Sequence, residues 1–150
     1  MENIEIGYRL IMAIERKKSE VLQNDLREID AEVERLMRKL EEIKNLSKEN
    51  DALGFTKPTE KTVESAEYFI MVMPYACLKS GAIFPTYDNG VIFMGHMETA
   101  TFSIYIKDDK FAFYIRPDNK MEKTSYSGDV GMDFVLKFRE GIRKTTGELI

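Results

Sequence analysis

The sequence has one cysteine, one histidine and no tryptophan in 150 residues. With Cys77 alone, neither an intramolecular disulfide nor a zinc site built from several cysteines can form, which favours a reducing compartment. The N-terminus lacks the basic flank and apolar run of a signal peptide, and the longest apolar run, residues 68–73, is too short to span a membrane. These absences predict a cytoplasmic protein.

The sequence also lacks an excess of basic residues. Its 22 Lys and Arg are outnumbered by 26 Asp and Glu, so the formal net charge is −4 and no overall positive field would hold a polyanion. Glycine-rich phosphate loops, nucleophile elbows and paired-cysteine motifs are absent as well. The hydrophobic content of 43% is enough for the core of one domain.

A heptad pattern near the N-terminus is the strongest signal in the chain. Its spacing alternates between four and three residues, which predicts a narrow apolar seam along a long helix that needs a covering partner. The residues of this seam are Leu22, Leu26, Ile29, Val33, Leu36, Leu40 and Ile43. We expect one helix to cover most of residues 3–47, and we predict the seam to be an interface with a partner helix or a second copy.

The charges that flank the seam favour an antiparallel arrangement. A parallel dimer would place Asp25 against Asp30 and Lys39 against Lys44, whereas an antiparallel pair brings Glu32 near Lys39 twice. The chain is therefore predicted to pair with itself, as a dimer or larger, or with a helix of another protein. The alternative is that the seam packs on the C-terminal domain of the same chain.

The remaining sequence predicts a small domain behind this helix. The expected division is a coiled-coil-like helix over 1–47, a polar linker over 48–58, an α+β domain over 59–144 and a tail over 145–150. Thr59 or Thr62 can cap a second helix that ends at Pro74, and the residues after it are expected to lead directly into the sheet.

The turn residues predict the strand order. Asn89-Gly90 favours a two-residue type I′ turn between strands at 83–88 and 91–94, and Pro85 places the first of these strands at a sheet edge. Asp108-Asp109 joins strands at 101–107 and 110–116. With that loop, the cross-strand pairs on one face are Ile106–Phe111, Ile104–Phe113 and Phe102–Ile115.

A fifth strand is expected at 122–127, and Gly128-Asp129 is expected to open the last helix. Its apolar face, Phe134, Phe138 and Ile142 with Val135, suits the aromatic face of the sheet. The predicted fold is thus α+β: a long N-terminal, coiled-coil-like helix, then a four- to five-stranded antiparallel β-meander packed by two helices.

The opposite face of the sheet is the most promising surface for a partner. Ser103, Tyr105, Tyr114 and Arg116 all fall on it. Tyrosine and arginine are enriched at protein interaction hot spots, and aromatic groups beside cations can also stack single-stranded nucleic acid. The acidic balance of the chain opposes nucleic acid, and tyrosine is in any case a good strand former.

Catalytic residues, metals and cofactors are not expected. His96 near Glu98, with Ser103 or Thr101 as nucleophile, is the one conceivable hydrolytic set, but a single loop histidine is more often structural. Aspartates such as Asp88 lie where turns prefer them, and no calcium-loop spacing occurs.

The second half of the chain resembles small uncharacterised bacterial and phage proteins in which a helix ends at proline and a meander follows. The matching stretches are residues 66–74, 85–91 and 102–106, while Gly95-His96 replaces the acidic-aromatic end of that pattern. The resemblance implies no activity.

The sequence predicts a non-enzymatic protein–protein interaction module, an adaptor, regulator or inhibitor, that oligomerises or captures a helix through its heptad seam. Two alternatives remain open. One is a small-ligand-binding or hydrolytic domain using His96 and the sheet face, and the other is a single-stranded nucleic-acid binder.

Overall fold

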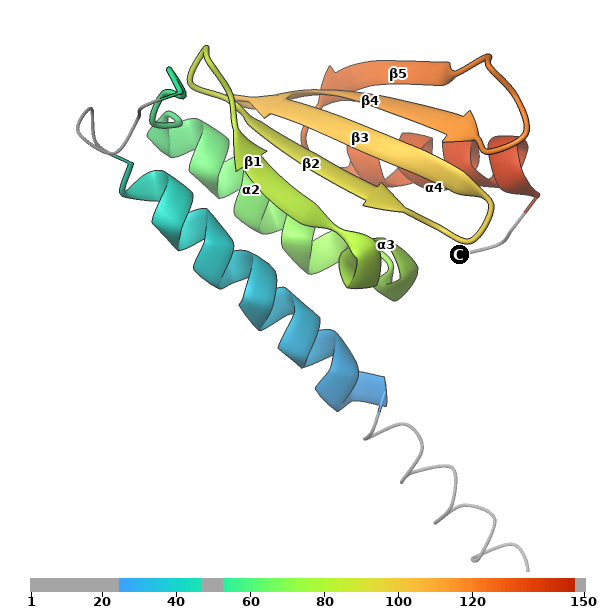
Figure 1. Cartoon of the computed structure of the whole chain (residues 1–150), viewed down its shortest axis with the longest axis horizontal. Coiled ribbons are helices and arrows are strands. Elements are labelled where there is room, and N and C mark those ends of the chain that lie inside the picture. Colours follow the sequence, from blue (N-terminus) through green and yellow to red (C-terminus); the bar gives the residue numbers. More distant parts are fainter. Residues whose placement is uncertain (1–24, 47–52, 148–150) are drawn as a thin grey trace, which may run out of the picture.

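The computed structural model describes residues 25–46 and 53–147 of the chain (Figure 1). A helix covers residues 25–44 and is followed by three further helices and five strands. The helices are α2 (Glu60–Val72), α3 (Tyr75–Ser80) and α4 (Met132–Thr146). The strands are β1 (Ala82–Pro85), β2 (Val91–His96), β3 (Ala100–Lys107), β4 (Lys110–Pro117) and β5 (Thr124–Asp129).

The five strands form one antiparallel meander in the order β1-β2-β3-β4-β5, which confirms the predicted α+β class. The helices lie on one face of the sheet, with α2 and α3 under the first strands and α4 under β4 and β5 (Figure 1). The predicted register of β3 and β4 is confirmed, because Ile106 lies opposite Phe111, Ile104 opposite Phe113 and Phe102 opposite Ile115.

The core between helices and sheet is largely aromatic. Phe134 of α4 packs edge-on against Phe111, with ring centroids 4.7 Å apart, and Phe138 packs edge-on against Phe102 and Phe113 at 5.9 and 5.2 Å. Such pairs add to the free energy gained by burying their apolar surface. The core face predicted from the sequence is therefore the one that α4 covers.

The β1–β2 connection differs from its prediction. Strand pairing ends at Pro85 and Val91, so the loop is longer than the predicted Asn89-Gly90 turn. Asn89 has a positive φ of 68°, but Gly90 does not. The Gly90 N–H donates to the Thr86 hydroxyl at 2.8 Å. The Asn89 side-chain amide donates to the carbonyl of Lys57 at 2.8 Å, so a contact distant in sequence shapes the loop.

Part of the predicted linker packs on the domain. Thr56 donates its N–H to the carbonyl of Thr86 at 2.8 Å, and the rings of Phe55 and Tyr87 stack with centroids 4.9 Å apart. The described residues of the linker, 53–58, are therefore held against the end of β1. Residues 47–52 lie outside the described part of the chain.

Two boundaries of the C-terminal region are corrected. Gly128 and Asp129 belong to β5 rather than to the last helix, because Val130 still donates its N–H to Asp109 at 2.7 Å and so prolongs the pairing with β4. The last helix continues two residues past Lys144, to Thr146, and ends at Gly147, whose φ of 74° suits a helix C-cap.

The segment after Pro74 is a short helix, α3, rather than a direct lead into the sheet. Its last turn ends at Gly81, where a Cβ atom would lie 2.0 Å from the ring of Phe93. Only glycine permits this close approach between α3 and the sheet.

The second half of the heptad seam lies in the core of this chain. Leu36, Leu40 and Ile43 expose 0%, 2% and 3% of their surface, and Val33 packs partly against the same core. Arg35 donates to the carbonyls of Leu78 and Gly81 at 3.0 and 2.9 Å, which ties this helix to α3 and β1.

Because of this burial, the prediction that the whole seam is an interface with a partner is wrong for its second half. Leu36, Leu40 and Ile43 are covered by their own chain, because their apolar surface completes the core beside α2 and β1. Leu26 is 50% exposed and Ile29 is half-buried, so pairing through the first part of the seam stays a prediction. Leu22 lies outside the described residues.

We expect Leu40→Ala to lower the free energy of unfolding by about 2–5 kcal/mol, because it leaves a cavity in a closed core. Leu26→Ala, at the same kind of heptad position, should cost less than about 0.5 kcal/mol since it is half exposed. Urea denaturation of both variants measures the difference. Equal small losses would contradict the packing of this helix on the domain.

Candidate functional site

The face of the sheet opposite the helices has no covering layer among the described residues (Figure 1). We call it the open face. Cross-strand neighbours form rows on it, since strand residues of one parity point to one side. One row is His96, Thr101 and Arg116; the next is Met94, Ser103, Tyr114 and Ser125; the third is Ile92, Tyr105, Ala112 and Ser127.

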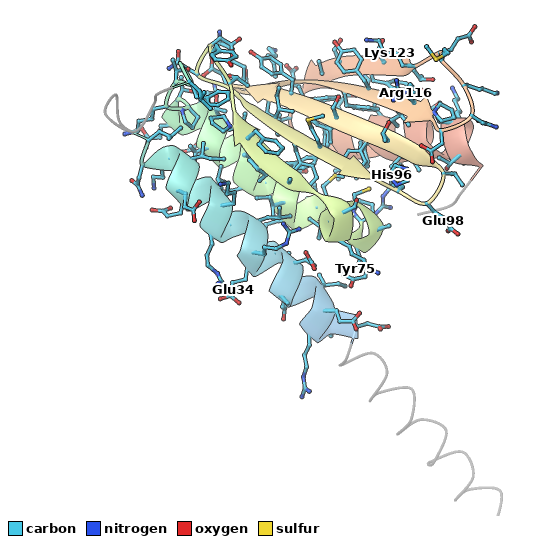
Figure 2. The ribbon with its side chains drawn as sticks, viewed as in Figure 1. Glu34, Tyr75, His96, Glu98, Arg116 and Lys123 are labelled. Carbon is cyan, nitrogen blue, oxygen red and sulfur yellow. The ribbon has the colours of Figure 1, made fainter. Side chains whose placement is uncertain are left out.

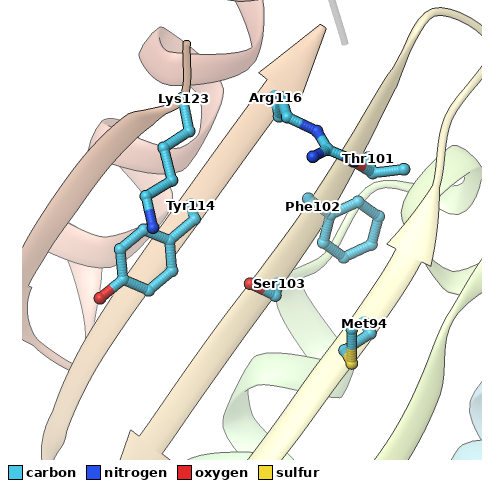
Figure 3. A pocket seen from close by; sticks show the side chains of 7 residues that line it. All are labelled: Met94, Thr101, Phe102, Ser103, Tyr114, Arg116 and Lys123. Atoms are coloured by element: carbon cyan, nitrogen blue, oxygen red, sulfur yellow. The ribbon is translucent and has the colours of Figure 1, made fainter. Parts of the chain in front are cut away.

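A hollow of about 220 Å³ lies at the centre of the open face (Figure 3). It exists because the small Ser103 lies between two larger side chains, Met94 and Tyr114, in the same row. The residues that line it are Met94, Thr101, Phe102, Ser103, Tyr114, Arg116 and Lys123.

The hollow carries positive charge and hydroxyl groups. The Lys123 ammonium lies 4.5 Å from the centre of the Tyr114 ring, in a cation–π contact, and Arg116 reaches over β3 towards Thr101 (Figure 3). Figure 2 shows Arg116 and Lys123 on the outer side of the sheet. Among the described residues, neither cation is paired with a carboxylate, so both can receive an anionic group from a partner.

Tyr105 and Asp88 form a polar corner next to the hollow. The Tyr105 hydroxyl donates to Asp88, and the Lys107 ammonium lies 3.9 Å from the same carboxylate. Hydrogen bonds from Thr86 and Tyr105 hold the pKa of Asp88 below its usual value. Partial burial and the adjacent Asp88 carboxylate raise the pKa of Tyr105 to about 12.

His96 pairs with Asp118 rather than with Glu98. Its Nε2 lies 3.0 and 3.1 Å from the two carboxylate oxygens, and both side chains are about half exposed. Thr101 is its cross-strand neighbour, yet within the described residues no hydroxyl side chain is hydrogen-bonded to His96. The His96–Asp118 pair therefore lacks the hydrogen-bonded hydroxyl nucleophile that a hydrolytic site would need.

The four predicted partner-face residues, Ser103, Tyr105, Tyr114 and Arg116, all lie on the open face. Lys123 was missed, because the prediction assigned no residue of the fifth strand to this face; Lys123 directly precedes β5. Its alignment over Tyr114 depends on the β4–β5 register, which the sequence signals only weakly.

A second groove, of about 450 Å³, separates the N-terminal helix from β1. It is lined by Arg35, Leu36, Arg38, Lys39 and Glu42 of the helix and by Ala82, Ile83 and Phe84 of the strand. Lys39 is paired with Glu42 at 3.3 Å and Arg38 with Glu34 at 3.2 Å. The cations of this groove are thus already neutralised within the helix, in contrast to those of the open face.

The other chemically reactive groups lie away from both grooves. Cys77 is fully buried, its Sγ lies 3.7 Å from Met97 Sδ, and burial raises the pKa of its thiol to about 12. No group of three His, Cys, Asp or Glu side chains that could hold a metal ion occurs in the described part of the chain.

Comparison of the chain with protein-family models, with curated proteins and with solved structures gave no match. Within residues 25–46 and 53–147, no helix has both the length and the apolar character needed to cross a membrane. The site must therefore be interpreted from its own geometry.

We expect Asp88→Asn to lower the pKa of Tyr105 from about 12 towards its usual value near 10, because the carboxylate charge no longer opposes ionisation. Some elevation should remain, since burial is the largest cause. Observing the Tyr105 ring by NMR through an alkaline titration measures this shift. Asp118→Asn, at the far end of the open face, is the matched control and should leave the Tyr105 pKa unchanged.

The raised pKa also has a consequence for stability. A group whose folded pKa lies above its unfolded value stabilises the fold below the unfolded pKa, and that stabilisation is lost as the pH rises through the folded pKa. The Tyr105 contribution should therefore be present below pH 10 and lost towards pH 12.

Proposed function

We propose that this protein is a non-catalytic binding module, an adaptor, regulator or inhibitor, that holds a protein partner on the open face of its sheet. The single observation that carries this proposal is the central hollow, which is lined by an aromatic ring and by two cations without carboxylate partners in the described residues. Arginine and tyrosine supply much of the binding free energy in protein interfaces.

The expected partner carries acidic side chains. Arg116 can form a bidentate bond with a carboxylate, and the hydroxyls of Thr101 and Ser103 can donate to the same group. Met94, which is 47% exposed, adds an apolar contact on the other side of the hollow. An acidic segment with one apolar residue would satisfy both parts of this surface.

The open face suits a single-stranded nucleic acid less well than it suits a protein partner. Base stacking needs a free aromatic face, and Lys123 already lies over one face of Tyr114. The described lining of the hollow also includes two cations, Arg116 and Lys123, so few phosphate contacts could form there and binding through them would be weak.

A contribution of the N-terminal helix remains part of this proposal. Leu26, exposed on the seam, and the half-buried Ile29 leave a short apolar stripe that a second helix could cover. This stripe would add affinity or an oligomeric state to the binding module. The buried part of the seam packs the helix on the core of the domain that carries the open face.

The proposal is tested by capture of partners on the immobilised chain, followed by calorimetry with the purified partner. Tyr114→Ala and Arg116→Ala should each weaken binding at least about tenfold, as hot-spot residues do. The control Arg139→Ala removes an exposed arginine from α4, on the other side of the sheet, and should leave affinity unchanged.

Two results would contradict the proposal. One is a partner whose affinity is indifferent to Tyr114→Ala and Arg116→Ala. The other is binding of a single-stranded oligonucleotide that falls steeply with salt and is lost in Arg116→Ala, which would assign the same face to nucleic acid.

A further inference from the structure

The two edges of the sheet are not equivalent. At the β1 edge the strand has four residues, and Pro85 has no N–H to offer another strand. Arg35 bonds to the carbonyl of Gly81 at 2.9 Å, and Thr56 bonds to the carbonyl of Thr86 at 2.8 Å. The β1 edge is therefore short and closed at both ends.

The β5 edge has one such protection, a bond from Lys137 to a backbone carbonyl, and is otherwise open. It is six residues long, contains no proline and is largely exposed. Val130 donates its N–H to the carbonyl of Asp109. Because hydrogen-bonded pairs alternate in an antiparallel ladder, the backbone N–H and C=O groups of residues 124, 126 and 128 point towards β4. Ser125, Ser127 and Asp129 then direct their backbone N–H and C=O groups outwards. Lys137 Nζ does bond to the Ser127 carbonyl, at 3.0 Å, from outside the sheet.

The side of α4 beside this edge carries charges of alternating sign. Asp133 pairs with Lys137 at 3.2 Å, and Glu140 pairs with Lys144 at 2.8 Å. Their position is fixed by the bond from Lys137 to Ser127, whose carbonyl lies on the free edge. An order of minus, plus, minus, plus is complementary to itself when read in the opposite direction.

The geometry points to a second copy of this chain as the occupant of the β5 edge, paired antiparallel about a two-fold axis at Ser127. Ser127 would face Ser127 of the second copy, and Ser125 would face its Asp129, each through a pair of backbone hydrogen bonds. The Ser127 carbonyl, which already accepts from Lys137, would accept the added bond with its second lone pair. On the core side, Tyr126 would lie opposite Gly128 of the second copy, beside the Asp133 and Lys137 side chains that closely approach this glycine.

The same axis brings the two α4 helices side by side with matching charges. Near Ser127 the axis passes the middle of α4, because Lys137 contacts Ser127 and Gly141 approaches the ring of Tyr126. Asp133 then faces Lys144 of the second copy, and Lys137 faces its Glu140. One two-fold axis thus satisfies both the strand pairing and the charges.

This pairing joins two five-stranded sheets into one continuous sheet. Because the axis is perpendicular to the sheet, both open faces point the same way. The dimer would present two identical surfaces side by side and could bind a partner that has two matching segments. The dimer itself does not depend on the proposed function, since it uses the edge of the sheet and not its face.

The test uses cysteine variants of the full chain under mild oxidation. Facing residues of a hydrogen-bonded pair have Cα atoms about 5.5 Å apart, which is within disulfide range, so Ser127→Cys should form a covalent dimer. In the same register the two Ser125 residues lie about 14 Å apart, so the control variant Ser125→Cys should not form a covalent dimer. The native Cys77 is buried and is common to both variants.

The solution mass supplies the second measurement. The full chain should be a dimer by light scattering, and Ser127→Pro, which removes an outward N–H, should shift it to a folded monomer. Ser127→Ala keeps that N–H and should remain dimeric. Lys144→Glu should weaken the dimer several-fold, whereas Arg139→Glu should not, because Arg139 lies more than a quarter of a turn around α4 from each of the four charges.

The outcomes separate this dimer from other assemblies. A monomeric chain whose Ser127→Cys variant does not cross-link overturns the inference. So does a dimer that persists in Ser127→Pro and is lost in Leu26→Asp, which would place the contact on the N-terminal seam. Cross-linking of Ser127→Cys together with monomeric Ser127→Pro supports it, whether or not a partner binds the open face.

Discussion

The packing of α4 on the paired strands β3 and β4 is the constraint on which the other features depend. Phe134 and Phe138 meet Phe111, Phe113 and Phe102, so one face of the sheet is fixed as the inner face. Because strand residues alternate, the same contacts fix which side chains point outwards. A shift of one residue in this register would bury Tyr114 and Arg116 and expose the phenylalanines.

Much of this arrangement was predictable, because it follows from local signals. The period-two pattern of β3 and β4 and the Asp108-Asp109 turn were sufficient for the register, and Pro85 was sufficient for the edge strand. The open-face residues followed from that register alone. The hollow itself did not, since its shape depends on the size of neighbours in three strands and on Lys123 outside them.

The misplaced features share a dependence on contacts that are distant in sequence. The Asn89 loop is shaped by residues 56 and 57, and β5 is lengthened through the contact of Val130 with Asp109. The heptad seam is a clear local pattern, but a pattern does not specify what covers it. Arg35, whose bonds to α3 and β1 select the chain's own core, gives no sign of that role in the sequence.

The proposed attraction of an acidic partner to an acidic protein is consistent with the charges of the open face. The carboxylates of Asp88, Asp118 and Asp129 lie at the border of the face, and each is paired: Asp88 with Tyr105 and Lys107, Asp118 with His96, and Asp129 with Lys110. Arg116 and Lys123, in the hollow, have no carboxylate partner among the described residues. At physiological salt, exposed charges act over about 8 Å, so a segment in the hollow responds to these two cations more than to the distant net charge. In the proposed function, the local arrangement of charges, and not the overall balance, therefore selects the partner.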